Sequence, residues 1–151
     1  MFTFLVVALL MTLAVAIGGW FRPVPGNKPP PAPTYTDQQI AEAKSKVCAA
    51  YAQVRKAGDV AGARNTGNDP TAVLAVATST RQVLEVGSRY LMTKLAELPA
   101  ISPDLAAAVR QLASIYQQLA IDYLAEANDS ELDPLVRAGN EAHSTIEGLC
   151  K

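Results

Sequence analysis

Two cysteines have the most definite chemistry of any residues in this chain. Cys48 and Cys150 are the only cysteines among its 151 residues. A lone pair separated by about 100 positions lacks the spacing of a zinc site, and the chain has no C-x-x-C motif for redox chemistry. We therefore predict a structural disulfide, which is typical of proteins in an oxidising compartment. The alternative is two reduced, buried cysteines in a cytosolic domain.

The only histidine, His143, is a second candidate for chemistry because Glu147 follows it by four residues. These residue types could form half of a metal site or an acid–base dyad. Residues four apart on a helix are surface neighbours, and we interpret the two as such a surface pair. Carboxylate di-iron bundles need glutamates and Glu-x-x-His motifs on facing helices, whereas the apolar faces here carry Ala, Leu, Val and Tyr. We predict no catalytic residue, no metal site, no cofactor and no enzymatic activity.

An acidic segment over residues 129–133 (DSELD) has a superficial likeness to a calcium-binding loop. It lacks the turn glycine and the distant bidentate glutamate of such loops, and proline follows it directly. We interpret it as a solvated loop that ends in the cap of the last helix.

Four tyrosines fall on or near faces that are predicted to point inward. Tyrosine rings could line a pocket for an apolar ligand, although core tyrosines with hydroxyls at the rim are the alternative. Val86 and Ile121 fall on otherwise polar faces, and they become candidate partner contacts if they cluster in space. The candidate ligand-lining residues are Tyr51, Tyr90, Tyr116 and Tyr123.

Four amphipathic helices are predicted to position these side chains. The first begins at a capping box formed by Thr36 and Gln39, and it is expected to end near Arg64. Its apolar face starts at Ile40, and that of the second helix starts at Val73. The later helices should each begin at a polar cap followed by proline, because the missing N–H of proline would have no partner there. These starts are Asp69-Pro70, Ser102-Pro103 and Asp133-Pro134.

Short connections between long helices imply antiparallel neighbours, so residues 36–151 are predicted to form an all-α, up-down-up-down four-helix bundle. This arrangement can be tested against the cysteines. At about 1.5 Å per residue, Cys48 lies roughly 23 Å from the end of the first helix, and Cys150 lies roughly 23 Å from Pro134. The two cysteines therefore come level on adjacent helices, which supports the predicted disulfide.

The first 21 residues contain no charged side chain and would span about 30 Å as a helix, the thickness of a bilayer core. Trp20, followed closely by Arg22, is typical of the interfacial end of a span. The sequence thus predicts a transmembrane helix over residues 1–21 that binds the lipid bilayer. A cleaved signal peptide is the alternative, since residues 14–16 (Ala-Val-Ala) fit a cleavage site, but a basic n-region is missing.

Residues 22–35 are expected to form an extended tether, because six prolines and a glycine fall within them. Arg22 and Lys28 follow the span and no basic residue precedes it, which favours a cytoplasmic C-terminus under the positive-inside rule. The predicted disulfide favours the opposite side. We expect a single-pass protein of the plasma membrane with an extracytoplasmic C-terminal domain.

The net charge of −1 gives no sign of attraction to nucleic acid. Residues 36–98 carry eight basic and six acidic side chains, and residues 99–151 carry three basic and eight acidic ones. Helices from the two halves would therefore attract one another weakly.

The proline-rich tether, the segment 35–40 (YTDQQI), the run 47–51 (VCAAY) and the second cysteine at the end of the chain together resemble a group of small proteins. These are the alanine- and proline-rich, single-pass envelope proteins of mycobacteria and related actinobacteria. The resemblance implies an external helical domain and brings no activity. Many of these relatives have a basic segment before the span, which this chain lacks. The expected function is a non-enzymatic accessory or scaffold domain that binds a protein or envelope component; the alternative is a carrier or sensor of an apolar ligand in the bundle core.

Overall fold

The structure is a computed structural model that describes residues 33–64, 67 and 69–151. The chain divides into two compact units, Met1–Thr34 and Tyr35–Lys151. The predicted anchor (1–21) and most of the predicted tether (22–32) lie outside the described residues. Within the part of the chain that is described, no helix is both long and apolar enough to cross a membrane.

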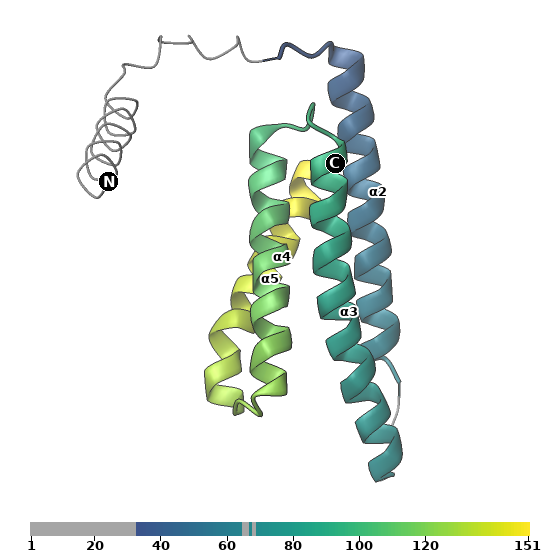
Figure 1. Cartoon of the computed structure of the whole chain (residues 1–151), viewed down its shortest axis with the longest axis vertical. Helices are drawn as coiled ribbons and strands as arrows, with labels where there is room; N and C mark the ends of the chain where they lie inside the picture. Colours follow the sequence, from purple (N-terminus) through teal and green to yellow (C-terminus); the bar gives the residue numbers. More distant parts are fainter. Residues whose placement is uncertain (1–32, 65–66, 68) are drawn as a thin grey trace, which may run out of the picture. The chain divides into compact units, whose positions relative to one another are not determined.

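The second unit consists of four helices, with no strand among its described residues: α2 (Asp37–Gly62), α3 (Pro70–Glu97), α4 (Pro103–Leu124) and α5 (Asp129–Cys150). They run alternately in opposite directions, and each packs against its neighbour in the sequence (Figure 1). The prediction of an all-α helical bundle is confirmed. The contact between α2 and α5 is the least extensive of these pairings.

Three of the four predicted helix starts are confirmed. At the start of α2, the Gln39 N–H donates to Thr36 Oγ1 over 3.2 Å and the Thr36 N–H donates to Gln39 Oε1 over 2.9 Å, which completes the capping box. Helices α3 and α4 begin at their prolines, and Asp69 caps α3 by accepting from the Thr71 N–H over 2.9 Å.

The predicted start of the last helix at Asp133-Pro134 is wrong, and so is the interpretation of residues 129–133 as a loop. Helix α5 begins at Asp129, with Asn128 as its N-cap and a reciprocal capping box between Asn128 and Glu131. Acidic side chains in a first turn also interact favourably with the helix dipole. These contacts outweigh the cost of Pro134, which lies in the second turn of the helix and removes one backbone hydrogen bond there.

The core lies at the centre of the bundle, and α4 contributes most to it. Its predicted inward face is buried from Leu105 to Leu119. Completely buried side chains meet it from the other three helices: Val47 from α2, Leu91 from α3 and Ile146 from α5. Burial of such large aliphatic side chains is the main source of stability in the bundle.

The predicted core position of Val73 is wrong, because 49% of this side chain is exposed. Ile40, at the start of α2, is also more exposed than predicted, at 39%. Val73 is exposed because α3 begins beyond the ends of the helices that pack against it. Arg64, just past α2, contacts Ser79, and Arg81 contacts the Tyr123 carbonyl in the last turn of α4. The first residues of α3, which include Val73, extend beyond both neighbouring helices (Figure 1).

Candidate functional site

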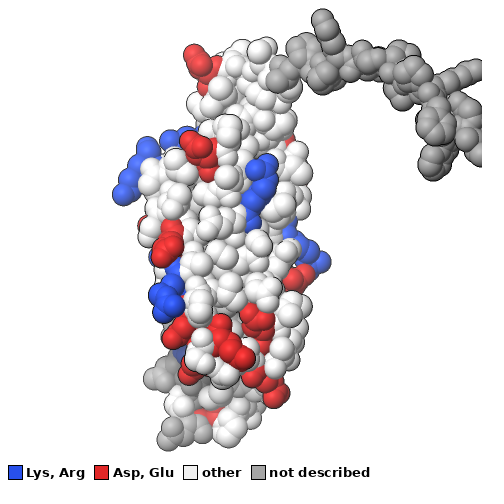
Figure 2. Space-filling view, turned by 90° about the vertical axis from the view of Figure 1, so that its left-hand side faces the viewer, with Lys and Arg blue, Asp and Glu red and all other residues white. Residues whose placement is uncertain are grey.

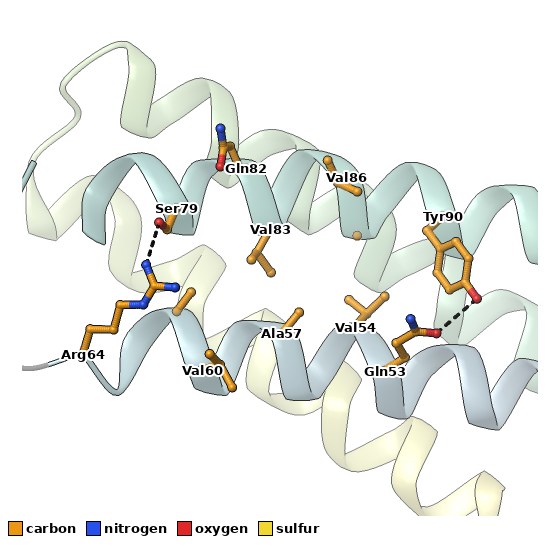
Figure 3. Close-up of a pocket in the computed structure, with 12 residues that line it drawn as sticks. Gln53, Val54, Ala57, Val60, Arg64, Ser79, Gln82, Val83, Val86 and Tyr90 are labelled. Carbon is orange, nitrogen blue, oxygen red and sulfur yellow. Dashed lines mark hydrogen bonds between the residues drawn. The ribbon is translucent and has the colours of Figure 1, made fainter. Parts of the chain in front are cut away.

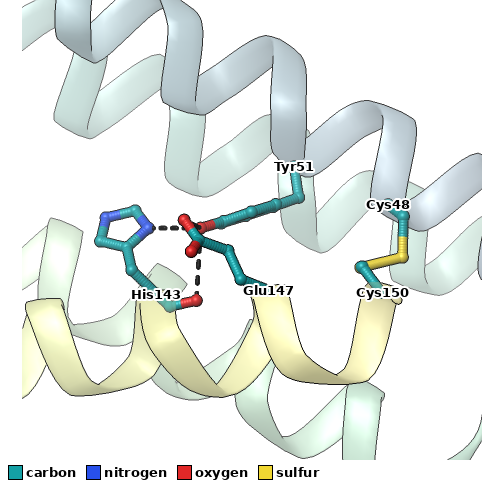
Figure 4. Close-up of a disulfide and its surroundings, with 5 residues drawn as sticks. All are labelled: Cys48, Tyr51, His143, Glu147 and Cys150. Atoms are coloured by element: carbon teal, nitrogen blue, oxygen red, sulfur yellow. Dashed lines mark hydrogen bonds between the residues drawn. A yellow bond between two sulfur atoms is a disulfide. The ribbon is translucent and has the colours of Figure 1, made fainter.

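The disulfide joins α2 to the last residue of α5 (Figure 4). Cys48 and Cys150 are 102 positions apart in the sequence, and their Cα atoms lie 5.7 Å apart. The predicted pairing is confirmed. We call this end of the bundle, which also holds the connection between α3 and α4 (98–102), the stapled end.

About two turns of α5 before Cys150, His143 lies between two tyrosines. The hydroxyl of Tyr51 from α2 is 2.9 Å from His143 Nδ1 (Figure 4), and the hydroxyl of Tyr116 from α4 is 3.1 Å from Nε2. The interpretation of His143 as half of a surface pair with Glu147 is therefore wrong. Because both ring nitrogens have a tyrosine partner, the histidine links three helices.

Glu147 instead forms an ion pair with Arg55 of α2, and the Arg55 guanidinium also donates to the Tyr51 hydroxyl over 3.3 Å. Burial raises the pKa of Tyr116 to about 12. Burial, followed by the nearby positive charge of Arg55, lowers the pKa of His143. At neutral pH the cluster therefore consists of a neutral histidine and two neutral tyrosines, which suits a structural role rather than proton transfer.

A groove of about 520 Å³ lies between α2 and α3 (Figure 3). Its middle is apolar, and a hydrogen bond across the groove lies at each end: Arg64, just past α2, to Ser79 over 3.3 Å, and Tyr90 to Gln53 over 3.3 Å. The lining residues are Gln53, Val54, Ala57, Val60, Ala61, Arg64, Ser79, Gln82, Val83, Val86, Gly87 and Tyr90.

Gly87 allows the two helices to approach closely at one side of this groove. A Cβ atom at this position would lie 2.8 Å from Val54 Cγ1, which is closer than real Cβ contacts. The glycine therefore determines how deep the groove is, since a side chain here would push α2 away from α3.

The structure distributes the predicted ligand-lining and contact residues over several places. Tyr90 and Val86 line the groove, and Tyr123 lines a smaller hollow beside Arg81. Tyr51 and Tyr116 contact His143 instead. Ile121 is 60% exposed on α4 and is not one of the residues that line the groove.

A second surface lies at the opposite end of the bundle. We call this surface the loop end and define it as residues 70–78 of α3 and residues 121–136 around the α4–α5 connection. Leu74, Ile121 and Leu124 are 60–65% exposed there. Residues 121–136 include five acidic and no basic side chains, and acidic side chains gather at the lower end of the face in Figure 2. The acidic residues are Asp122, Glu126, Asp129, Glu131 and Asp133.

The groove was not predicted from the sequence, although the apolar residues that line it form a recognisable pattern. Ala57 and Val60 on α2 and Val83 on α3 lie beside the predicted core faces and widen the apolar surface of each helix. A second apolar stripe on two successive helices would have suggested either a fifth packing element or an open groove.

No family model, curated protein sequence or solved structure matches this chain. Within the described ranges, no group of three or more His, Cys, Asp or Glu side chains is placed to hold a metal ion. The disulfide, the groove and the loop end are therefore the features from which a function can be inferred.

Proposed function

We propose that this chain is a membrane-anchored accessory domain of the cell envelope, held outside the cytoplasm, that binds a partner protein through its loop end. No enzymatic step is part of this proposal. The bundle would act as a rigid spacer between the bilayer and the partner.

The disulfide supports the extracytoplasmic location, because structural disulfides persist in oxidising compartments and are rare in the cytosol. The uncharged segment 1–21 supports the anchor through its length and composition. The resemblance to single-pass envelope proteins of actinobacteria is consistent with both parts of the proposal.

The observation that carries the binding role is the exposure of Leu74, Ile121 and Leu124 at one end of the domain, by 60–65% each. Ile121 and Leu124 are three residues apart on α4 and are therefore neighbours on its surface. Exposed apolar side chains that adjoin one another are typical of surfaces that another protein covers. The same end of the domain carries the five acidic side chains of residues 121–136. We therefore infer a partner that presents apolar and basic side chains. A second copy of this chain fits less well, since two acidic loop ends would repel each other.

Site-specific photocrosslinking of the full chain in its native membrane would test this role. A photoreactive residue at Leu124 is expected to give one discrete crosslinked product, and Glu126→Gln with Asp133→Asn should reduce its yield. The matched control is a photoreactive residue at Met92, which is 40% exposed on the stapled half of α3. Equal crosslinking from both positions, or none from Leu124, would contradict the proposed surface.

The groove between α2 and α3 favours a second candidate function, the binding of an apolar or amphipathic ligand. Its volume of about 520 Å³ lies within the range of small-molecule sites. The groove lies between two helices at the surface of the bundle, rather than in the bundle core among Tyr51, Tyr116 and Tyr123.

A further inference from the structure

We infer that the groove between α2 and α3 is a binding site for a single-chain anionic amphiphile of the fatty-acid class. This inference concerns a different surface from the loop end and does not depend on the partner proposed above. Its basis is the arrangement of polar and apolar side chains along the groove.

The shape of the groove favours a ligand of limited length. Ser79 and Tyr90 mark its two ends on α3, and eleven residues of helix correspond to about 16 Å. Both ends are closed by the hydrogen bonds from Tyr90 to Gln53 and from Arg64 to Ser79. A partner helix would need an open-ended groove, whereas a single flexible acyl chain can bend to fit between these two polar bridges.

The middle of the groove favours an aliphatic chain. Ala57 from α2 and Val83 from α3 point into the space between the two helices (Figure 3), and Val60 and Val86 also line the groove. Val60 and Val86 are 53% and 57% exposed. Covering these side chains with an acyl chain would remove apolar surface from water, at about 25 cal/mol per Å².

One end of the groove favours a negative head group. Arg64 is the only charged side chain among the described residues that line it. Its guanidinium has five N–H donors, and Ser79 accepts from only one of its nitrogens, Nη1, so further N–H groups can bind a carboxylate. At the opposite end, Gln53 and Tyr90 are uncharged and would surround the end of the chain.

The inference can be tested by photolabelling the full-length chain in lipid nanodiscs with diazirine-bearing palmitate, followed by mapping of the labelled peptides. Labels are expected in the peptides that contain residues 53–64 and 79–90. Ala57→Trp should reduce this labelling at least about fivefold by filling the groove. Ala52→Trp is the matched control, because Ala52 is exposed on the same helix but does not line the groove.

Two further experiments test the charge of the head group and the number of acyl chains. Arg64→Gln is expected to weaken palmitate labelling about two- to fivefold, the range of a solvent-exposed ion pair, and to leave labelling by the matching uncharged alcohol unchanged. A two-chain diazirine phosphatidylglycerol should label these peptides less than palmitate does. Formation of the Cys48–Cys150 bond in each variant would show that the domain has folded.

Three results would overturn the inference. The first is equal palmitate labelling of Ala57→Trp and Ala52→Trp. The second is labelling spread over all four helices, and the third is an identical effect of Arg64→Gln on the acid and the alcohol.

Discussion

The stapled end and the loop end of the bundle differ in how firmly their helices are held together. At the stapled end, a disulfide and the Tyr51–His143–Tyr116 cluster join α2, α4 and α5. At the loop end, α3 extends past its neighbours and its residues 70–78 include no buried side chain. One end therefore maintains the fold, and the other leaves apolar surface exposed, where we propose that a partner binds.

The largest effect is expected from removing the disulfide. Replacing both Cys48 and Cys150 by serine should lower the free energy of unfolding by about 3–5 kcal/mol, since the bond closes a loop of about 100 residues. Urea unfolding, followed by circular dichroism, measures this difference. Leu124→Ser at the loop end is the control and should change stability by less than about 0.5 kcal/mol. A larger loss from Leu124→Ser than from the double serine variant would reverse the comparison.

The close approach of α2 and α3 at Gly87 should give the next largest effect. Gly87→Ala places a methyl group 2.8 Å from Val54 Cγ1 and is expected to destabilise the domain by about 1–3 kcal/mol. Gly148→Ala is the matched control in α5, where a Cβ meets nothing within 4 Å, and it should stabilise by about 0.5–1 kcal/mol. The two midpoints of urea unfolding would then move in opposite directions. Movement in the same direction would argue against a close contact at Gly87.

The histidine cluster predicts a dependence of stability on pH. Burial and Arg55 lower the pKa of His143, so below about pH 6.5 the unfolded chain binds a proton that the folded domain does not. The free energy of unfolding should therefore fall as the pH drops from 6.5 towards the lower pKa of the folded state. The midpoints of urea unfolding at pH 7.5, 6.5 and 5.5 would measure this loss of stability.

His143→Gln keeps hydrogen-bonding groups beside both tyrosines but does not titrate, so this variant should lose most of the dependence on pH in that window. The other groups that affect the His143 charge, Arg55, Glu147 and Asp59, stay in place in the variant. An unchanged slope in His143→Gln would show that another group causes the effect.

The smallest expected effect lies in the connection between α4 and α5. Glu126 has a φ of 57°, and the Ala127 N–H donates to the Asp122 carbonyl over 3.0 Å, which is the pattern of a Schellman helix end. Glycine adopts this conformation without a Cβ penalty, so Glu126→Gly should stabilise by about 0.5–1 kcal/mol. Glu126→Ala removes the same charge but keeps the Cβ, and a thermal melt of this control should show no gain. An equal gain in both variants would assign the effect to charge.

The sequence predicted the helical bundle, three helix starts and the disulfide, because these depend on local caps, periodicity and helix length. It failed at Asp133-Pro134 because the capping box of Asn128 and Glu131 is a stronger start than a polar residue before proline. It also failed at Val73, whose exposure depends on where the neighbouring helices end. Periodicity along one helix contains no information about the length of its neighbours.

The candidate sites were harder to predict for a similar reason. Tyr51 and Tyr116 fall on inward faces, as expected, but their partner His143 is 92 residues from Tyr51 and was assigned to the surface from its spacing to Glu147. The groove depends on the close approach of two helices at Gly87, which becomes visible only once the helices are paired.

The redox state of the cysteines in the living cell tests the stapled end and the proposed location most directly. Acid-quenched cells that express the full chain can be treated with a thiol-reactive mass tag before and after reduction, with a single-cysteine Cys150→Ser variant as the standard for one tag. We predict no tag before reduction and two tags after it, as expected for a stapled domain outside the cytoplasm. Two tags before reduction would place the domain in a reducing compartment and would contradict both the stapled end and the proposed location.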